Sequence, residues 1–317
     1  MLNNMFKITG LIAGTIMSLS SAASAQVLSV GTTEGGAVAQ LGAAVSNVVS
    51  SHSDYQMRPQ AMAGTQQYMT GVDMGRIDFG ISNSMQYYMG VSGTMLSEGQ
   101  PHENLRVVAT LAPFVQGVIV TNKSGVSNVA ELAGMRIPAG YNASPLFEYF
   151  WDAFLAGSNM SRDDVSGVPV TSLPNSWQAF REGQVDAVIA AAGSAAVREM
   201  NATIDGGIRY IPLEPDAKMM AALPKTRIEV VEPAEGLDGI EVPTGLHVYE
   251  TVLFAHKDVS EDAVYAVTRA LAENEAALKA SGPLWSNYST KQIHTDFELE
   301  YHPGALRYYE EAGLSAK

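Results

Sequence analysis

Residues 27–36 read Val-Leu-Ser-Val-Gly-Thr-Thr-Glu-Gly-Gly, a short apolar run that passes directly into a glycine- and threonine-rich turn. After the turn, apolar residues recur at intervals of three and four positions, at Val38, Leu41, Val45 and Val48. This spacing places them on one face of an α-helix. The segment is therefore predicted to form a strand, a turn and an amphipathic helix, which is the first half of a βαβ unit.

The same alternation continues along the chain. Thr65 is predicted as the N-cap of a second helix that ends near Gly75. Small polar residues, Ser82-Asn83-Ser84, follow the strand predicted at 77–81. Further strands are predicted at 57–63, 105–111 and 117–121, the last two on either side of Pro113.

The middle of the chain then repeats the opening. Gly140, which begins the turn Gly-Tyr-Asn-Ala-Ser after a predicted strand, lies 109 residues after Gly31. The segment Gly-Gln-Val-Asp-Ala-Val-Ile at 183–189 lies 108 residues after Gly-Arg-Ile-Asp-Phe-Gly-Ile at 75–81. Two features that keep nearly the same spacing predict two similar βαβαβ units. The alternative is that any doubly wound α/β protein contains such units.

The turns of both units are expected to form a binding edge. In an open parallel sheet, ligands bind beyond the carboxyl ends of the strands, and a cleft between two such edges is a common place for a small-molecule site. Crossings are predicted near Pro113 and near 243–249. The predicted organisation is lobe 1 at 26–113 plus 245–317, lobe 2 at 114–244, and a hinge that lets the lobes close on a ligand.

Composition narrows the function classes. The chain has 317 residues with 19 Lys and Arg against 33 Asp and Glu, a net charge of −14. Nucleic-acid binding is not expected, because phosphate contacts need clustered positive charge. The absence of cysteine excludes disulfides, thiolate metal sites and cysteine nucleophiles.

Residues 1–25 are expected to be a cleaved signal peptide. Lys7 supplies the positive region, 8–22 is apolar, and Ala23-Ser24-Ala25 is a cleavage site. A membrane anchor is the alternative, but the most apolar part, 8–17, is much shorter than the ~20 residues of a span. Cleavage after Ala25 predicts an exported, periplasmic protein.

Catalytic motifs are not found. The six histidines form no close ligand pair, and the chain contains neither a nucleophile elbow nor a phosphate-binding loop. Asp78 and Asp186 begin matched strands, where a carboxylate accepts backbone hydrogen bonds and fixes a turn. No metal and no cofactor is therefore expected, and the prediction is a binding protein. A periplasmic enzyme on the same fold is the rival hypothesis.

A binding function is favoured instead by Gly, Thr, Ser and Asn at helix N-termini, which present free N–H groups and hydroxyls; Thr65 belongs to this set. Such groups suit a carboxylate or another small anion. Capture by an arginine is not assigned, because the sequence does not place Arg58, Arg76, Arg136, Arg181 or Arg198.

Four segments resemble the TAXI family of TRAP transporter solute-binding proteins. The turn Gly31–Gly36 is similar to the opening motif of that family, and 183–193 to its G-x-x-D-A strand and small-residue turn. The segment 127–137 is similar to a pattern that is widespread in periplasmic binding proteins. The closing His-Pro-Gly-Ala-Leu-Arg-Tyr-Tyr at 302–309 also matches. The family often has an aromatic residue shortly after the first glycines, where this chain has Ala37-Val38.

The resemblance implies a two-lobe α/β fold of the type II periplasmic binding proteins, which closes on a small, usually anionic organic solute. It implies a monomer that delivers this solute to a TRAP membrane permease driven by an ion gradient. A protein serving an ABC importer or a sensor kinase is the alternative. The ligand contacts that the resemblance implies are Thr32, Thr33, Gly35, Gly36, Ser82, Asn83, Tyr141, Asn142, Ser144 and Gly193.

Overall fold

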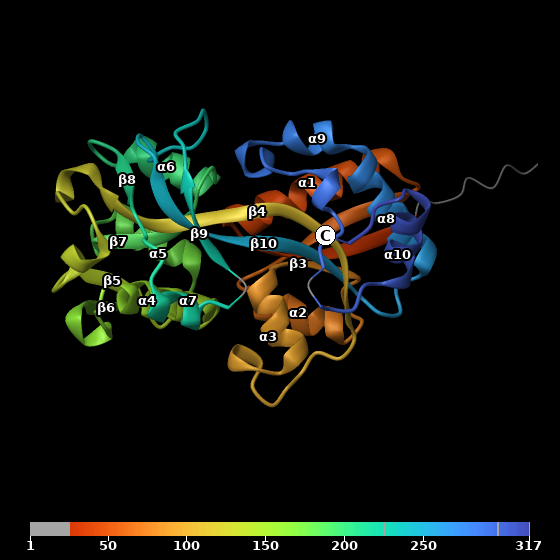
Figure 1. The fold of residues 1–317 in the computed structure, drawn as a ribbon, viewed down its shortest axis with the longest axis horizontal. Coiled ribbons are helices and arrows are strands. Elements are labelled where there is room, and N and C mark those ends of the chain that lie inside the picture. Colours follow the sequence, from red (N-terminus) through yellow and green to blue (C-terminus); the bar gives the residue numbers. More distant parts are fainter. Residues whose placement is uncertain (1–25, 225, 297, 317) are drawn as a thin grey trace, which may run out of the picture.

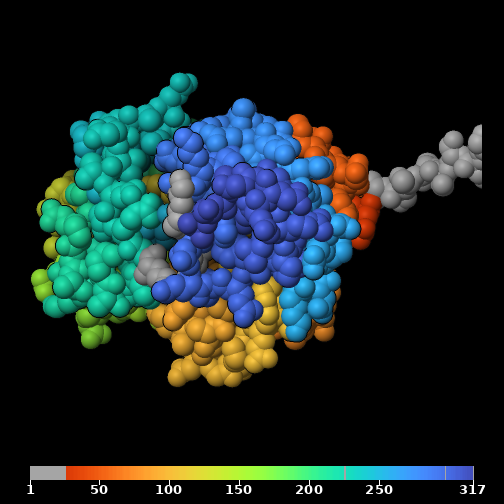
Figure 2. Space-filling view, turned by 45° about the vertical axis from the view of Figure 1, so that its right-hand side comes forward, coloured from red at the N-terminus to blue at the C-terminus, as the bar shows by residue number. Residues whose placement is uncertain are grey.

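The computed structural model describes residues 26–224, 226–296 and 298–316. The chain forms two halves joined by two long strands (Figure 1). We call the half that holds β1–β3 lobe 1 and the half that holds β5–β8 lobe 2. In the space-filling view of Figure 2, lobe 2 (green to teal) lies against the C-terminal helices of lobe 1 (blue). The predicted two-lobe α/β fold is confirmed. Residues 1–25, the predicted signal peptide, lie outside the described residues.

Lobe 1 is built on three parallel strands in the order β2-β1-β3. Its first elements are β1 (Gln26–Thr33), α1 (Gly36–His52), β2 (Tyr55–Met62), α2 (Thr65–Asp73), β3 (Phe79–Asn83) and α3 (Ser84–Ser92). Helix α2 begins one residue earlier than predicted: Gly64, not Thr65, is its N-cap. The reason is that the Gly64 backbone is extended while Thr65 is already helical.

Lobe 2 repeats this arrangement. Its elements are β5 (Arg136–Ala139), α4 (Leu146–Gly157), β6 (Ser166–Pro169), α5 (Leu173–Arg181), β7 (Ala187–Ala191), α6 (Ala195–Thr203), β8 (Ile208–Ile211) and α7 (Ala217–Ala222). Strands β5 and β6 are parallel. The Asp186 N–H, just before β7, donates to the Arg136 carbonyl of β5 at 2.8 Å, so the order β6-β5-β7 mirrors β2-β1-β3.

Strands β4 (Leu105–Thr121) and β10 (Thr244–His256) run antiparallel through both lobes. Sequence had predicted two strands interrupted at Pro113, whereas β4 is continuous. Proline lacks an N–H, and Pro113 lies opposite Glu250, at a β-bulge between Glu250 and Val252. Before the bulge, β10 pairs with β9 (Arg227–Val231); after it, β10 pairs with β3. The bulge therefore marks the passage between the lobes.

The C-terminal segment returns to lobe 1. It forms α8 (Glu261–Glu273), α9 (Glu275–Lys279) and α10 (Pro303–Glu311). Apolar periodicity over 262–281 predicts one helix. The structure divides it, because Asn274 has a non-helical backbone with ψ of 41°. Short 3₁₀ turns lie at Met95–Ser97, Asn122–Ser124, Val129–Leu132, Arg162–Asp164, Pro283–Trp285 and Thr290–Gln292. In the part of the chain that the structure describes, no helix has the length and apolar character to cross a bilayer.

Each lobe has a hydrophobic core of its own. Helices α1, α8 and α10 cover one face of the lobe 1 sheet, and their apolar faces bury Leu41, Val267 and Tyr309. In lobe 2, α4 and α5 bury Phe150, Trp151 and Phe180 against β4 and β7. The lobe 2 core also includes Met85 and Met89 of α3, so it reaches lobe 1 at that helix.

The paired aspartates have matching structural roles. Asp78 Oδ2 accepts hydrogen bonds from the backbone N–H and the hydroxyl of Ser29 in β1, both at 2.7 Å. Asp186 Oδ2 accepts from the backbone N–H of Arg136 in β5 at 2.8 Å, and Asp186 Oδ1 accepts from the guanidinium of Arg136 at 2.6 Å. The prediction that these carboxylates accept backbone hydrogen bonds is confirmed, but the donors lie on the neighbouring strands β1 and β5 and not in the turn before each aspartate. The matched bonds also support the repeat.

Replacement of Asp78 by alanine is expected to lower the free energy of unfolding by about 1–3 kcal/mol, because the Ser29 N–H loses its acceptor. Urea denaturation measures this change. Asp258→Ala is the control, since the Asp258 side chain is 75% exposed and is expected to change little. Equal stability of the two variants would contradict the assigned role.

Candidate functional site

A cavity lies between the lobes, at the carboxyl ends of their strands. Its wall combines Thr33 and Asn83 of lobe 1 with Ser144 and Trp177 of lobe 2, and Gln116 of β4. The cavity volume is about 70 Å³. With about 10–15 Å³ needed for each water, this space is equivalent to roughly five waters. It is therefore the size of a small organic molecule.

The lobes meet around this cavity through closely packed glycines. A methyl group on Gly64, before α2, would lie 1.5 Å from the carbonyl oxygen of Ala143 in lobe 2. A methyl group on Gly36 would lie 2.6 Å from the Trp177 ring, and the φ of Gly36 is +79°. The backbone of lobe 1 thus approaches lobe 2 to a distance that only glycine permits. This is the arrangement of a closed clamp.

Several helix N-termini point their first turns toward the cavity. The N-caps of α1, α2 and α4 make no side-chain hydrogen bond to the helix, which leaves part of their first-turn N–H groups to a ligand. In α2 the Gln67 N–H donates to the Gly64 carbonyl. In α4 the Phe147 and Glu148 N–H groups donate to the carbonyls of residues 144 and 145. In α3 the situation differs, because Asn83 Oδ1 already accepts from the Gln86 N–H at 2.6 Å. The polar part of the wall is thus rich in hydrogen-bond donors.

The other part of the wall is aromatic. Phe114 and Tyr249 stack with ring centroids 5.0 Å apart and an angle of 9° between the planes. The Phe150 ring is also nearly parallel to the Tyr249 ring, with the two centroids 6.0 Å apart. Across the cavity, Trp177 donates its indole N–H to the Ile189 carbonyl at 2.9 Å, which fixes the ring.

Gln116 is the polar side chain within this aromatic part, and it is only 1% exposed. Its Oε1 accepts from the Tyr249 hydroxyl, and its Nε2 lies 3.2 Å from His247 Nδ1. His247 is fully buried among Phe150, Phe154 and Tyr249. Desolvation lowers the pKa of His247 to about 3, so the ring is neutral at pH 7 and accepts the Gln116 amide proton.

The structure brings five of the residues selected from sequence to the cavity wall. They are Thr33, Gly35, Thr65, Asn83 and Ser144. Gly36 does not line the cavity, but it contacts the Trp177 ring, which does. Ligand contact by these residues is a proposal that the geometry makes possible.

The other selected residues lie elsewhere. Thr32 and Ser82 are buried within lobe 1, where Thr32 packs against α1 at Gly42. Asn142 is exposed. Gly193 packs against Pro283, away from the cavity.

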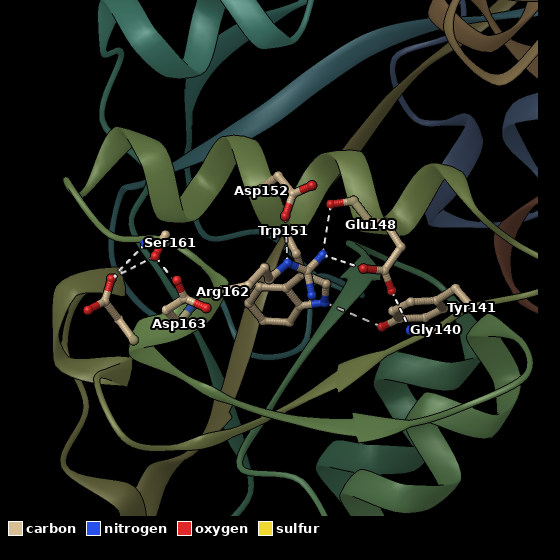
Figure 3. Close-up of polar contacts among 9 residues, drawn as sticks. Gly140, Tyr141, Glu148, Trp151, Asp152, Ser161, Arg162 and Asp163 are labelled. Atoms are coloured by element: carbon tan, nitrogen blue, oxygen red, sulfur yellow. Dashed lines mark hydrogen bonds and ion pairs between the residues drawn. The ribbon is translucent and has the colours of Figure 1, made fainter. Parts of the chain in front are cut away.

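Tyr141 does not line the cavity either. It is buried in lobe 2, with its hydroxyl directed at Trp151 (Figure 3). Its hydroxyl accepts from the Trp151 indole at 3.4 Å. Beside it, Glu148 accepts the Gly140 N–H at 2.5 Å and pairs with Arg162, which also binds Asp152. These contacts fix the second glycine turn.

The arginines that sequence had left unplaced are remote from the wall. Arg58 and Arg76 are exposed. Arg136 and Arg181 pair with Asp186 and Glu199, and Arg198 faces Asp238. Among the described residues that line the cavity, none is Asp, Glu, His, Lys or Arg. No three described His, Asp or Glu residues are grouped to hold a metal ion.

Sequence reasoning missed the aromatic wall. Phe114 and Gln116 lie in the predicted crossing, and Gln116 interrupts an apolar run from 114 to 120. A polar residue in a buried strand is a usable signal. Phe150 and Trp177 lie on the apolar faces of their helices, where periodicity predicts core residues and does not distinguish a core face from a cavity wall.

His247 is expected to make stability depend on pH. In the unfolded chain the imidazole of His247 has a pKa near 6.5. In the folded protein burial lowers this pKa to about 3. Between these values the unfolded state holds more protons, so stability falls as pH falls, by at most about 1.4 kcal/mol per pH unit. Urea denaturation from pH 7 to 4 is expected to show a shallower loss in His247→Gln. A slope identical to that of the wild type would contradict this assignment.

Comparison with known proteins places the fold. A protein described as a periplasmic transporter has a TM-score of 0.61 at 14% identity, covering 92% of this chain and 94% of its own. MatC from Rhodopseudomonas palustris with bound malate has a TM-score of 0.58 at 14% identity, and the match covers 81% of this chain and 89% of that one. PhnD1 from Prochlorococcus marinus in complex with methylphosphonate has a TM-score of 0.53 at 12% identity, and the match covers 92% of this chain and 100% of that one. At these identities the likeness shows the fold alone. The NMT1-like family model matches residues 30–313, and the chain therefore belongs to the NMT1-like family.

Proposed function

We propose that this protein is an extracytoplasmic solute receptor that closes on a small organic molecule between its lobes. The observation that carries the proposal is a cavity that receives wall residues from both lobes, while β4 and β10 connect the two lobes. Such a cavity opens when the lobes rotate apart. The wall contains hydrogen-bond donors and aromatic rings but no nucleophile–base pair, so the site is equipped to bind rather than to react.

The proposed location is the periplasm, and the proposed partner is a TRAP-type permease. The predicted signal peptide and the periplasmic transporter among the structural neighbours support the location. The resemblance to the TAXI family supports the partner. Delivery to an ABC importer or to a sensor kinase is the alternative within this class, and an enzyme on the same fold is the alternative outside it.

The proposed lobe limits are 26–113 plus 245–317 and 114–244, with the hinge in β4 and β10. The boundary at Pro113 coincides with the β-bulge. The second crossing, from lobe 2 back to lobe 1, is proposed near Glu250. Residues Thr244–Val248 of β10 still pair with β9 of lobe 2, whereas the residues after Glu250 pair with β3 of lobe 1. A hinge at a bulge is reasonable, since the ladder is already interrupted there.

The charge of the solute follows from the wall. An anionic, carboxylate-bearing solute, as the sequence predicted, would depend on helix N-termini alone, because no described lining residue is Arg or Lys. Malate and methylphosphonate are anions bound by neighbours of this fold. The fold does not transfer their chemistry to this wall.

Ligand binding is expected to stabilise and to compact the protein. A ligand at 100 times its dissociation constant adds about 2.7 kcal/mol to the free energy of unfolding. A thermal-shift screen against neutral and acidic metabolites detects this change, and small-angle scattering measures the radius. Turnover of a stabilising compound would favour the enzyme, and an unchanged radius with a saturating ligand would refute hinge closure.

Gly64→Ala is expected to weaken ligand binding at least roughly tenfold, or 1.4 kcal/mol, with little loss of lobe stability. The extended Gly64 backbone, with φ of −160°, accepts alanine, but the added methyl would overlap the Ala143 carbonyl in the closed form. Isothermal titration calorimetry measures the affinity. Gly167→Ala, in exposed β6, is the control. Wild-type affinity in Gly64→Ala would contradict the closed arrangement.

The partner is tested by transport. With the permease in proteoliposomes, uptake is expected to require this protein and an ion gradient, and not ATP. Uptake that requires ATP would replace the TRAP partner by an ABC importer.

A further inference from the structure

We propose that the solute is an uncharged molecule with a single flat ring, held against the aromatic wall and oriented by Gln116. This inference rests on the proposed function and names the chemical class that the cavity selects. It departs from the anionic solute that the sequence resemblance implies.

The wall disfavours both signs of charge. Helix N-termini carry partial positive charge, which opposes a cation. The faces of aromatic rings carry partial negative charge, which opposes an anion that lies on them. No described lining residue supplies a counter-charge of either sign. An ion leaving water for this wall would lose its hydration and gain only helix N–H groups or ring faces, without a formal counter-charge, whereas a neutral molecule loses less hydration.

The rings favour a flat ligand. Phe114, Tyr249 and Phe150 have nearly parallel planes, within about 10° of each other in each neighbouring pair. The indole of Trp177 is fixed in the opposite part of the wall by its bond to Ile189. Rings that are already immobile offer stacking without further loss of freedom on binding. A volume equivalent to roughly five waters has room for one ring and not for two.

Gln116 gives the ligand its orientation. One amide proton of Gln116 faces His247, and its carbonyl accepts from Tyr249. The second amide proton and the second lone pair of the carbonyl stay available for a ligand. A buried donor and acceptor side by side match an amide or lactam edge, which presents the complementary pair. The free N–H groups of α1, α2 and α4 serve further acceptor atoms of the ligand.

The experiment compares molecules that differ in charge but hardly in shape. The probes are benzamide with benzoate and nicotinamide with nicotinate, and glutamate serves as an acyclic anion. Isothermal titration calorimetry on the mature protein, after unfolding and refolding to release carried molecules, measures affinity. Each amide is expected to bind at least tenfold more tightly than its carboxylate. Mass spectrometry of the released molecules is expected to show a neutral, single-ring compound.

Two variants test the wall. Gln116→Leu is expected to remove most of the amide preference, and Phe114→Leu to weaken all ring compounds at least fivefold. Gln100→Leu, at an exposed site, is the control and is expected to bind as the wild type. Thermal unfolding confirms that each variant folds. An unchanged amide preference in Gln116→Leu would remove Gln116 from the proposal.

The outcomes separate this inference from the proposed function. Tighter binding of a carboxylate or of glutamate, or release of an acyclic or charged molecule, would overturn the uncharged ring and leave the solute receptor standing. Binding of no probe, together with release of no small molecule, would overturn both.

Discussion

The antiparallel pairing of β4 with β10 is the contact on which the rest of the structure depends. Each strand belongs to the sheets of both lobes, so one ladder determines how the lobes face each other. The same ladder supplies part of the cavity, because Phe114, Gln116 and Tyr249 lie on it just beyond the bulge. In the proposed receptor, the hinge and the binding wall are thus one element, and rotation of the lobes would move the other wall residues relative to these three.

Closure depends on backbone meeting backbone. At Gly64 the chain of lobe 1 contacts the Ala143 carbonyl, and at Gly36 it contacts the Trp177 ring. Side chains at these positions would separate the lobes by their own size. The glycine-rich turns therefore have a second role besides exposing helix N–H groups: they bring the cavity walls of both lobes close together, as the proposed solute receptor requires.

Sequence predicted the two-lobe fold because its signals are local and repeated. The spacings of 108 and 109 residues reflect real equivalence, seen in the matched bonds of Asp78 to β1 and Asp186 to β5. The continuity of β4 through Pro113 was not predictable, since a bulge depends on the partner strand. The site was predicted only where helix N-termini form it. Thr32 and Tyr141 belong to the two glycine turns, but their side chains are buried within their lobes. The direction of such a side chain is decided by packing.

The cavity illustrates why total charge is a poor guide to a ligand. The chain carries a net charge of −14, yet its charged groups pair with one another or face water, as Arg136 does with Asp186. The described residues that line the cavity form a wall without formal charge. It consists of peptide N–H groups, aromatic faces, the amides of Asn83, Gln86 and Gln116, and hydroxyls such as that of Ser144. Within such a wall the free energy of binding depends on hydrogen bonds that are complete and on ring faces that are covered. Burial keeps His247 neutral, and a neutral His247 holds the Gln116 amide without bringing a charge to the cavity.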